Sequence, residues 1–197
     1  MTNICVIPAR GGSRRIPRKN IKLFHGKPII AYSIETAKAS GLFTDVWVST
    51  EDDEIGRIAE GYGAKWYKRA ETLTDDYIGT QEVARDFIQW MHDQDEPYKY
   101  VCCIYPTAPM LSYLDLKRGL HELKRDDIWF SFGVGTNPLR DAGQFYWSKS
   151  VMLKNKAHLY GTHTALIAID ESRVCDINTE LDWFIADQMY DELQDVV

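Results

Sequence analysis

Short apolar runs alternate with stretches of helical periodicity along this chain, and that alternation constrains the fold more than any other feature. Residues 4–7 form the first run, which has the length and composition of a buried parallel strand. Further predicted strands lie at residues 46–48, 64–67, 101–105, 128–134, 144–147 and 165–169. Strands that alternate with helices predict a mostly parallel sheet with helices on both faces.

Helix start and stop signals separate these runs. Residues 28–39 form a predicted helix that begins with proline and is followed by Gly41, and residues 51–62 form another with acids in its first turn. Further helices are predicted at residues 80–91, at residues 112–123 and from Thr179 onward. Because no repeat, low-complexity segment or linker interrupts the pattern, we predict one three-layer, Rossmann-like α/β domain over residues 1–197.

Composition limits where the protein works. No run reaches the roughly 18 to 20 apolar residues that span a bilayer, and the N-terminus lacks a signal-peptide pattern. The four cysteines show neither a CxxC pair nor zinc-type spacing, and Cys102 and Cys103 lie in an apolar run typical of buried, reduced thiols. We therefore expect a cytoplasmic protein with no membrane partner.

Positive charge is concentrated in one segment of an otherwise acidic chain. The formal net charge is −6, yet residues 10–27 contain seven basic side chains and no acidic one. Nucleic-acid binding usually needs a broad basic surface, so we expect no nucleic-acid partner. A small, multiply charged anion suits one concentrated basic segment better.

The basic segment directly follows the first predicted strand, which is where ligands bind in open α/β sheets. Gly11 and Gly12 permit a sharp turn whose amide groups can face an anion, and arginines can hold phosphate oxygens with paired hydrogen bonds. The spacing matches neither a Walker P-loop nor G-x-G-x-x-G. The segment predicts a triphosphate site, and a solvated basic loop is the alternative.

Other candidate sites are weaker. His158 and His163 lie five residues apart without a cysteine or carboxylate at ligand spacing, which is typical of surface histidines. The G-x-S-x-G motif of a serine hydrolase is absent. The aromatic run at residues 145–147 alternates like a strand, so core packing is its simplest interpretation.

Several segments together match a known pattern. The basic loop reads IPARGGSRRIPRKNI over residues 7–21, and GKPIIAYSI, VST and an Arg69-x-x-x-Leu73-x-x-Asp76 stretch follow it. Later segments are YPTAP at residues 105–109, DAGQFYW at 141–147 and DINTELDW at 176–183. These segments resemble the acylneuraminate cytidylyltransferases, the CMP-sialic acid synthetases, and are most like the pseudaminic acid cytidylyltransferase branch. The resemblance covers nearly the whole chain.

The resemblance implies a nucleotidyltransferase fold and a specific reaction. An Mg²⁺-dependent enzyme of this kind transfers CMP from CTP to the anomeric hydroxyl of a nonulosonic acid and releases pyrophosphate. Its partners would be CTP and an acidic nine-carbon keto sugar of the pseudaminic or sialic acid type. Two alternatives stay open: a nucleotidyltransferase for another keto-acid sugar, such as an eight-carbon one, and a CTP-binding paralogue without turnover.

By position, the resemblance also implies roles for individual residues. Arg10, Lys19 and Asp176 would be catalytic, and Asp176 and Asn178 would bind the metal, although capping of the last helix is the alternative for Asp176. The implied nucleotide-binding residues are Ala9, Arg10, Gly11, Gly12, Ser13, Lys19, Asn20, Arg69, Asp76 and Thr80. The implied sugar-binding residues are Tyr105, Thr107, Arg140 and Gln144.

The sequence departs from the family pattern in two places. Asn178 replaces the second acid of a closing Asp-x-Asp motif, so weaker metal affinity is expected. Relatives also have a longer insertion before Asp141 that supplies part of their dimer interface and some sugar contacts, whereas only residues 135–140 span the gap here. We therefore expect a weaker or rearranged homodimer. Candidates for its apolar contact surface, or else for core packing, are Trp66, Trp90 and Trp129.

Overall fold

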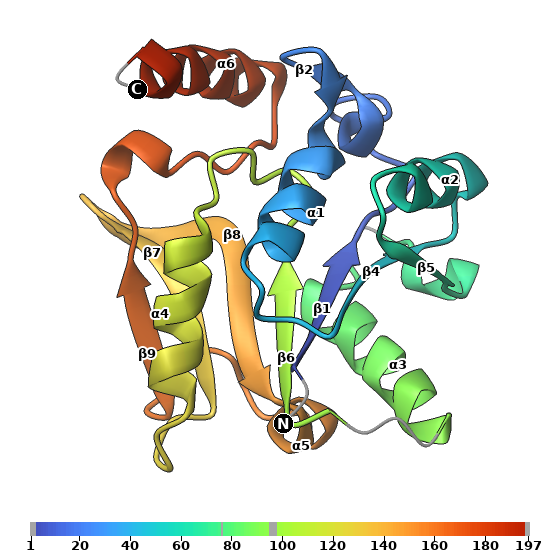
Figure 1. Cartoon of the computed structure of the whole chain (residues 1–197), viewed down its shortest axis with the longest axis vertical. Coiled ribbons are helices and arrows are strands. Elements are labelled where there is room, and N and C mark those ends of the chain that lie inside the picture. The colour runs from blue at the N-terminus through green and yellow to red at the C-terminus, as the bar shows by residue number, and fades with distance from the viewer. Residues whose placement is uncertain (1–2, 76, 95–97, 196–197) are drawn as a thin grey trace.

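The computed structural model describes residues 3–75, 77–94 and 98–195. Its centre is a seven-stranded sheet in the order β5-β4-β1-β6-β8-β7-β9 (Figure 1). The strands of this sheet are β1 Asn3–Pro8, β4 Asp45–Thr50, β5 Lys65–Lys68, β6 Tyr100–Ile104, β7 Phe130–Thr136, β8 Leu139–Lys149 and β9 Thr164–Ala168. A separate two-stranded ribbon consists of β2 Leu23–Phe24 and β3 Lys27–Pro28.

Helices occupy the segments between the strands. They are α1 Ile29–Ala39, α2 Asp53–Gly61, α3 Thr80–Asp93, α4 Tyr113–Leu123, α5 Ser150–Lys154 and α6 Glu180–Asp195. Single 3₁₀ turns lie at Lys19–Ile21, Glu71–Leu73 and Glu171–Arg173. Every predicted strand and helix is present, whereas α5, the ribbon and the 3₁₀ turns are too short to give a periodic pattern. Within the described ranges, no helix has the length and apolar character needed to cross a membrane.

The sheet is mostly parallel, as predicted, with one exception. β1 pairs in parallel with β4 and β6, β4 with β5, and β7 with β9, but β8 runs antiparallel to both of its neighbours. The chain returns from β7 through Asn137 and Pro138 alone, and strands joined by so short a turn must be antiparallel. Residues 135–140, which span the shortened gap, are therefore the end of a β-hairpin, and β8 begins earlier than predicted.

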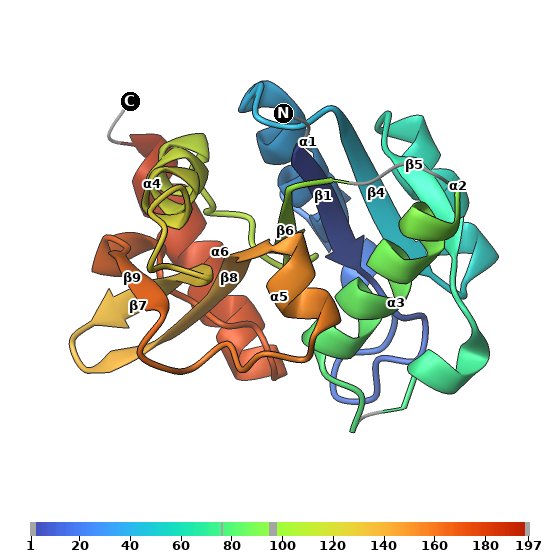
Figure 2. The same cartoon turned by 90° about the horizontal axis from the view of Figure 1, so that it is seen from below.

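Helices cover both faces of the sheet, which confirms the three-layer α/β prediction. Helices α1, α2 and α4 pack on one face, and α3 and α5 on the other (Figure 2). In β1, Cys5 and Ile7 pack on the face covered by α1, α2 and α4, while Ile4 and Val6 pack on the face covered by α3 and α5. The strand is apolar throughout because it is buried on both sides.

The C-terminal helix α6 packs against the β2–β3 ribbon and the start of α1. The Phe24 ring meets those of Tyr32 and Trp183 edge-on, with centroid distances of 5.6 and 5.5 Å. His25 lies between two carboxylates of α6, with Nε2 at 3.0 Å from Asp187 and Nδ1 at 3.5 Å from Asp191. These contacts join the ribbon to α6.

The three tryptophans named above do not form an exposed surface. Trp90, a residue of α3, and Trp129, which precedes β7, are both partly buried against the same core cluster, and Trp66 lies against α2. Large apolar side chains that are exposed include Leu139 in the β7–β8 hairpin and Leu181 and Phe184 on α6. Core packing is therefore the correct interpretation of the tryptophans.

Close packing of α2 on β5 leads to a stability prediction. A Cβ atom at Gly56 would lie 2.3 Å from the Trp66 ring, whereas one at Gly61, in the same helix, would meet no described atom within 4 Å. We expect Gly56→Ala to lower the free energy of unfolding by about 1–3 kcal/mol through overpacking. The control, Gly61→Ala, should be neutral or stabilising by up to about 1 kcal/mol. Urea unfolding of both variants measures the difference, and equal stabilities would contradict the packing described here.

Candidate functional site

A cavity of about 300 Å³ opens where β1 and β6 end. Its lining includes the basic loop after β1, the Tyr105–Thr107 turn after β6, the start of α3 and the segment before α6. The predicted site residues that line it are Arg10, Ser13, Lys19, Asn20, Arg69, Thr80, Tyr105, Thr107, Asp176 and Asn178. The topology thus brings together residues that are up to 168 positions apart along the chain.

Five described residues of the prediction do not line the cavity: Ala9, Gly11, Gly12, Arg140 and Gln144. Ala9 is buried in the core, where its amide donates to the Ser49 carbonyl at 2.9 Å. Arg140 stays within the β7–β8 hairpin and pairs with Glu171 at 2.9 Å. Gln144 is only 2% exposed, and its side-chain amide donates to the Arg173 carbonyl. Asp76 lies outside the described residues.

Gln144 nevertheless supports the cavity through its backbone. Its carbonyl accepts a hydrogen bond of 2.8 Å from the Tyr105 amide, and the Tyr105 carbonyl accepts one of 2.8 Å from Ser33. Burial raises the pKa of the Tyr105 hydroxyl. The turn after β6 is therefore held from two sides while Tyr105 and Thr107 face the cavity.

Gly11 has a different role from the one predicted. Its amide donates to the Glu51 carboxylate at 2.7 Å, and a Cβ atom in its place would lie 2.4 Å from Asp52 Oδ2. Glycine is needed here because the loop approaches the start of α2 so closely. Gly12, by contrast, is exposed and has open space around it among the described atoms.

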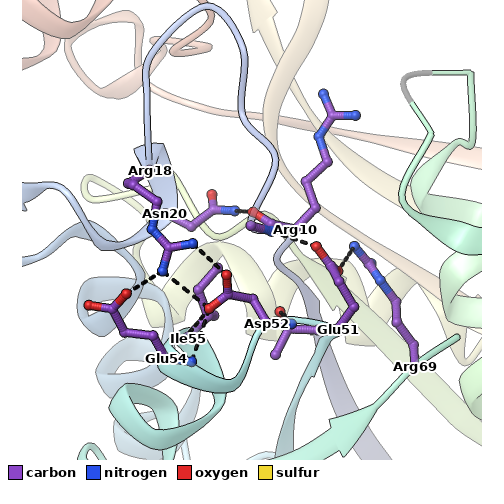
Figure 3. Close-up of polar contacts among 10 residues, drawn as sticks. Arg10, Arg18, Asn20, Glu51, Asp52, Glu54, Ile55 and Arg69 are labelled. Carbon is purple, nitrogen blue, oxygen red and sulfur yellow. Dashed lines mark hydrogen bonds and ion pairs between the residues drawn. The ribbon is translucent and has the colours of Figure 1, made fainter. Parts of the chain in front are cut away.

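The basic loop is anchored to α2 by ion pairs (Figure 3). Arg18, in the left-handed region with φ 54°, pairs with Asp52 and with Glu54, the latter at 2.6 Å. Asp52 also caps α2 by accepting hydrogen bonds from the Glu54 and Ile55 amides, each at 3.0 Å. Arg18 therefore fixes the path of the loop through these ion pairs instead of extending freely into solvent.

The seven basic side chains of this segment divide into two groups. Arg18, Lys22 and Lys27 pair with acidic residues of α2, α6 and α1. The remaining four line the cavity: Arg10, Arg14, Arg15 and Lys19. The fold therefore selects about half of the basic residues for the cavity, a division that the sequence alone did not reveal.

The segment before α6 closes one side of the cavity. Lys19 Nζ donates to the Ile177 carbonyl at 2.6 Å, and Arg15 donates to the Asn178 side-chain oxygen at 3.0 Å. The Asn178 amide nitrogen in turn donates to Asp176 at 2.6 Å. Contacts therefore join the basic loop to both residues predicted to bind the metal.

The helix cap of α6 is formed by other residues. The Asp182 carboxylate accepts hydrogen bonds from the Asn178 and Thr179 amides at 2.9 and 2.7 Å, and the Thr179 hydroxyl accepts one from the Asp182 amide at 3.2 Å. Capping, the alternative role considered for Asp176, is thus already supplied. The Asp176 carboxyl instead lies against the Gly143 backbone, where a Cβ atom would come within 2.9 Å of it.

The pKa values of Lys19 and Asp176 are shifted in opposite directions. Burial lowers the pKa of Lys19, and Arg15 and Arg10 lower it further, while Asp176 opposes the shift. Burial raises the pKa of Asp176, although the hydrogen bond from Asn178 and the charge of Lys19 partly offset the change. Clustered cations of this kind would be stabilised by a bound polyanion.

Arg69 contributes a buried cation to the cavity. The residue follows β5, is only 5% exposed, and donates to Glu51 Oε2 at 3.0 Å. Its Nε is buried and has no hydrogen-bond partner among the described residues. An unpaired donor next to a cavity indicates a place for a ligand acceptor.

Sequence comparisons agree with this geometry. A family profile described as cytidylyltransferase matches residues 4–176. The pseudaminic acid cytidylyltransferase of Campylobacter jejuni is 34% identical over an alignment that covers 96% of this chain and 97% of that protein. This chain belongs to the cytidylyltransferase family. The alignment spans 224 residues against 197 here, so the relative has residues that this family member lacks.

More distant matches include one further sequence relative and two solved structures. N-acylneuraminate cytidylyltransferase A of Danio rerio is 27% identical over 93% of this chain and 49% of its own length. The structure of CMP:2-keto-3-deoxy-manno-octonic acid synthetase complexed with CTP has a TM-score of 0.76 at 16% identity and covers 98% of this chain and 99% of its own. The manganese complex of Rv0371c from Mycobacterium tuberculosis has a TM-score of 0.69 at 11% identity, with coverage of 95% and 99%. The predicted nucleotidyltransferase fold is therefore confirmed.

The Arg18–Asp52 pair leads to a pH-dependent prediction. Its hydrogen bond lowers the pKa of Asp52 from 3.8 to about 2. Because the folded value lies below the unfolded one, the stabilisation is fully present above pH of about 4 and is lost as the pH falls toward 2. We expect Asp52→Asn, which retains a capping oxygen, to lower the free energy of unfolding by about 1 kcal/mol at neutral pH, since Arg18 is 39% exposed.

Urea unfolding across this pH range measures the effect. The difference between the wild type and Asp52→Asn should shrink toward zero in acid. In an Arg18→Gln background, the pH-dependent difference should shrink to the smaller part that comes from the hydrogen bonds of the Glu54 and Ile55 amides. A difference that persists unchanged at the acidic end would show that the ion pair does not stabilise the loop.

Proposed function

We propose that this chain transfers CMP from CTP to the anomeric hydroxyl of an acidic keto sugar of the nonulosonic acid class and releases pyrophosphate. The observation that supports this most strongly is the convergence of four cations of one loop on a cavity next to Asp176, in a member of the cytidylyltransferase family. A triphosphate needs several cations, and the acceptor sugar needs space beside it. The relative from Campylobacter jejuni is named for pseudaminic acid, which is our leading candidate for the sugar.

Residue roles follow from position in the cavity. Arg10, Ser13 and Lys19 would hold the triphosphate through charged hydrogen bonds, and the Asn20 side chain, which donates to the Arg10 carbonyl at 2.9 Å, would keep the loop in place. Arg69 and Thr80 would lie around the cytidine. The sugar oxygen forms a bond to the α-phosphorus as the bond to pyrophosphate breaks, so catalysis consists mainly of positioning and charge stabilisation.

The sugar side of the cavity would be built by Tyr105 and Thr107, which line it. Arg140 and Gln144 were also expected to contact the sugar, but their side chains are engaged with Glu171 and the Arg173 carbonyl. Contact with the sugar would require those interactions to be exchanged. We therefore assign the acceptor side first to the turn after β6.

The residues near the cavity suit a divalent cation. Asp176 offers a hard carboxylate oxygen that is partly desolvated, and Mg²⁺ is commonly held by one or two carboxylates together with substrate phosphates. Asn178 offers an amide oxygen, which accepts from Arg15 in this structure. We propose that Asp176 is the main protein ligand, with Asn178 next to it. A bound Mg²⁺ would supply charge stabilisation for the departing pyrophosphate.

Two further proposals concern the setting of the enzyme. We propose a cytoplasmic location, which is supported by the four unpaired cysteines, since reducing compartments keep thiols free. The short β7–β8 hairpin cannot provide an extended dimerisation arm, so we propose a homodimer that is weaker than, or rearranged from, the arrangement that the family resemblance implies.

Pyrophosphate release with a panel of keto-acid sugars tests the proposed function. We expect release only with CTP and fastest with a nine-carbon acid. Lys19→Met should reduce the rate about ten- to a hundredfold, because a charged hydrogen bond to phosphate contributes roughly 1.5 to 3 kcal/mol. The control is Lys22→Met in the same loop, whose side chain pairs with Glu180 away from the cavity and should leave the rate nearly unchanged.

The same panel separates the alternatives. Release only with an eight-carbon acid would indicate a different sugar. CTP binding without release from any acid would identify a non-catalytic paralogue. Equal rates for Lys19→Met and the wild type would favour the alternative interpretation, in which the basic segment is a solvated loop.

A magnesium titration tests the assignment of Asp176 and Asn178. Asn178→Asp would place a second carboxylate where an amide now donates to Asp176 at 2.6 Å, and their repulsion would be relieved by a cation. We expect this variant to reach half-maximal activity at several-fold lower Mg²⁺ and to melt at a lower temperature in EDTA. Asp176→Ala should reduce activity at least a hundredfold at any Mg²⁺ concentration. An unchanged Mg²⁺ dependence of activity in both variants would indicate that the metal binds at another site.

A further inference from the structure

Glu51 connects the ends of three neighbouring parallel strands. It follows β4 directly, and its carboxylate accepts hydrogen bonds from the Gly11 amide at 2.7 Å and from Arg69 Nη2 at 3.0 Å (Figure 3). Gly11 belongs to the loop after β1, and Arg69 follows β5, the two strands that flank β4 in the sheet. One side chain thus joins the basic loop to the buried arginine.

The contact with Arg69 lies in a desolvated environment. The side chains of Arg69 and Glu51 are 3% and 16% exposed, in contrast to the half-exposed ion pairs elsewhere in the basic loop. Burial lowers the pKa of Arg69, and the charge and hydrogen bond of Glu51 oppose that shift. A guanidinium that loses its counter-charge in such surroundings must move toward water or another acceptor.

Arg69 also has a donor that no described residue satisfies. Its Nε is buried without a hydrogen-bond partner among the described residues, and the residue lines the cavity. Cytosine presents two adjacent acceptors, N3 and O2, whereas uracil presents a donor at N3. A guanidinium fixed in one orientation can distinguish these edges, because an unmatched donor facing a donor is costly.

We propose that Glu51 is a positioning residue that fixes Arg69 and the Gly11 loop relative to each other and thereby sets the affinity and base selectivity of the nucleotide site. This inference rests on the proposed function in taking CTP as the nucleotide. Glu51 does not line the cavity, so it acts through its two partners. The loop that faces the phosphates and the arginine that faces the base become one unit.

Glu51→Gln tests the proposal with little change in size. Gly11 N–H and Arg69 both donate to the carboxylate, and glutamine offers only one acceptor oxygen while its amide nitrogen faces a donor. One of the two contacts must therefore break, and Arg69 loses its counter-charge. The matched control is Asp53→Asn, two residues along the chain, which removes an exposed ion pair with Lys68.

The measurement is the dissociation constant of CTP and of UTP with Mg²⁺, by isothermal titration calorimetry, together with the KM for sugar. We expect Glu51→Gln to weaken CTP binding about tenfold or more and to reduce the preference for CTP over UTP. The KM for sugar should stay within about twofold. Asp53→Asn should resemble the wild type in all these values.

A purely structural role would lower the melting temperature of Glu51→Gln without changing the CTP to UTP ratio of the folded protein, and that result would overturn the proposal. If Glu51→Gln does not fold, Arg69→Met is compared with Arg69→Met/Glu51→Gln, in which no buried charge is left unpaired. The proposal expects similar CTP affinities in these two variants. A tenfold difference between them would show that Glu51 acts independently of Arg69.

The outcome also separates this inference from the proposed function. Wild-type protein that binds CTP but releases no pyrophosphate with any sugar refutes the function and leaves the role of Glu51 measurable. Wild-type selectivity in folded Glu51→Gln refutes the inference and leaves the function intact. A wild type that binds no CTP overturns both.

Discussion

Repulsion between like charges is the constraint around which the candidate site is built. Residues 10–27 place seven cations in one short segment, and such a loop keeps a single path only if counter-charges offset the repulsion. The fold supplies them from α2 for Arg18 and from α6 for Lys22. Arg15 and Lys19 instead meet neutral oxygens next to the cavity. Their charge therefore favours a polyanionic ligand at that position.

The sheet makes this distribution of charge possible. Parallel strands β1, β4 and β5 end at the same edge, so the residues that follow them become neighbours despite wide separation in sequence. Glu51 and Asp52 are adjacent in the chain, yet Glu51 pairs with Arg69 and Asp52 pairs with Arg18 (Figure 3). Two consecutive acids thereby hold the basic loop through Arg18 and the buried Arg69.

Sequence reasoning predicted the elements whose signal is local and missed the contacts that depend on tertiary pairing. The apolar run of β1 is sufficient to predict a doubly buried strand, because burial on both faces leaves no polar alternation. The antiparallel direction of β8 depends on a turn of two residues, and nothing in the aromatic pattern at residues 145–147 encodes it. Gly11 was correctly singled out as a position that requires glycine, but the partner that requires it, Asp52, becomes visible only in three dimensions. The pairing of Arg140 with Glu171 was likewise not foreseen, because Glu171 lies 31 residues away in the chain.

Ile177 belongs to two systems at once. Its side chain is fully buried in the cluster that seats α6, while its carbonyl accepts the hydrogen bond from Lys19. The position of a cation beside the cavity is therefore specified by hydrophobic packing some distance from any charge. To graft the basic loop onto another α/β scaffold, one would also need to transfer residues 176–178 and the apolar residues that pack against α6. The loop motif alone does not fix the position of Lys19.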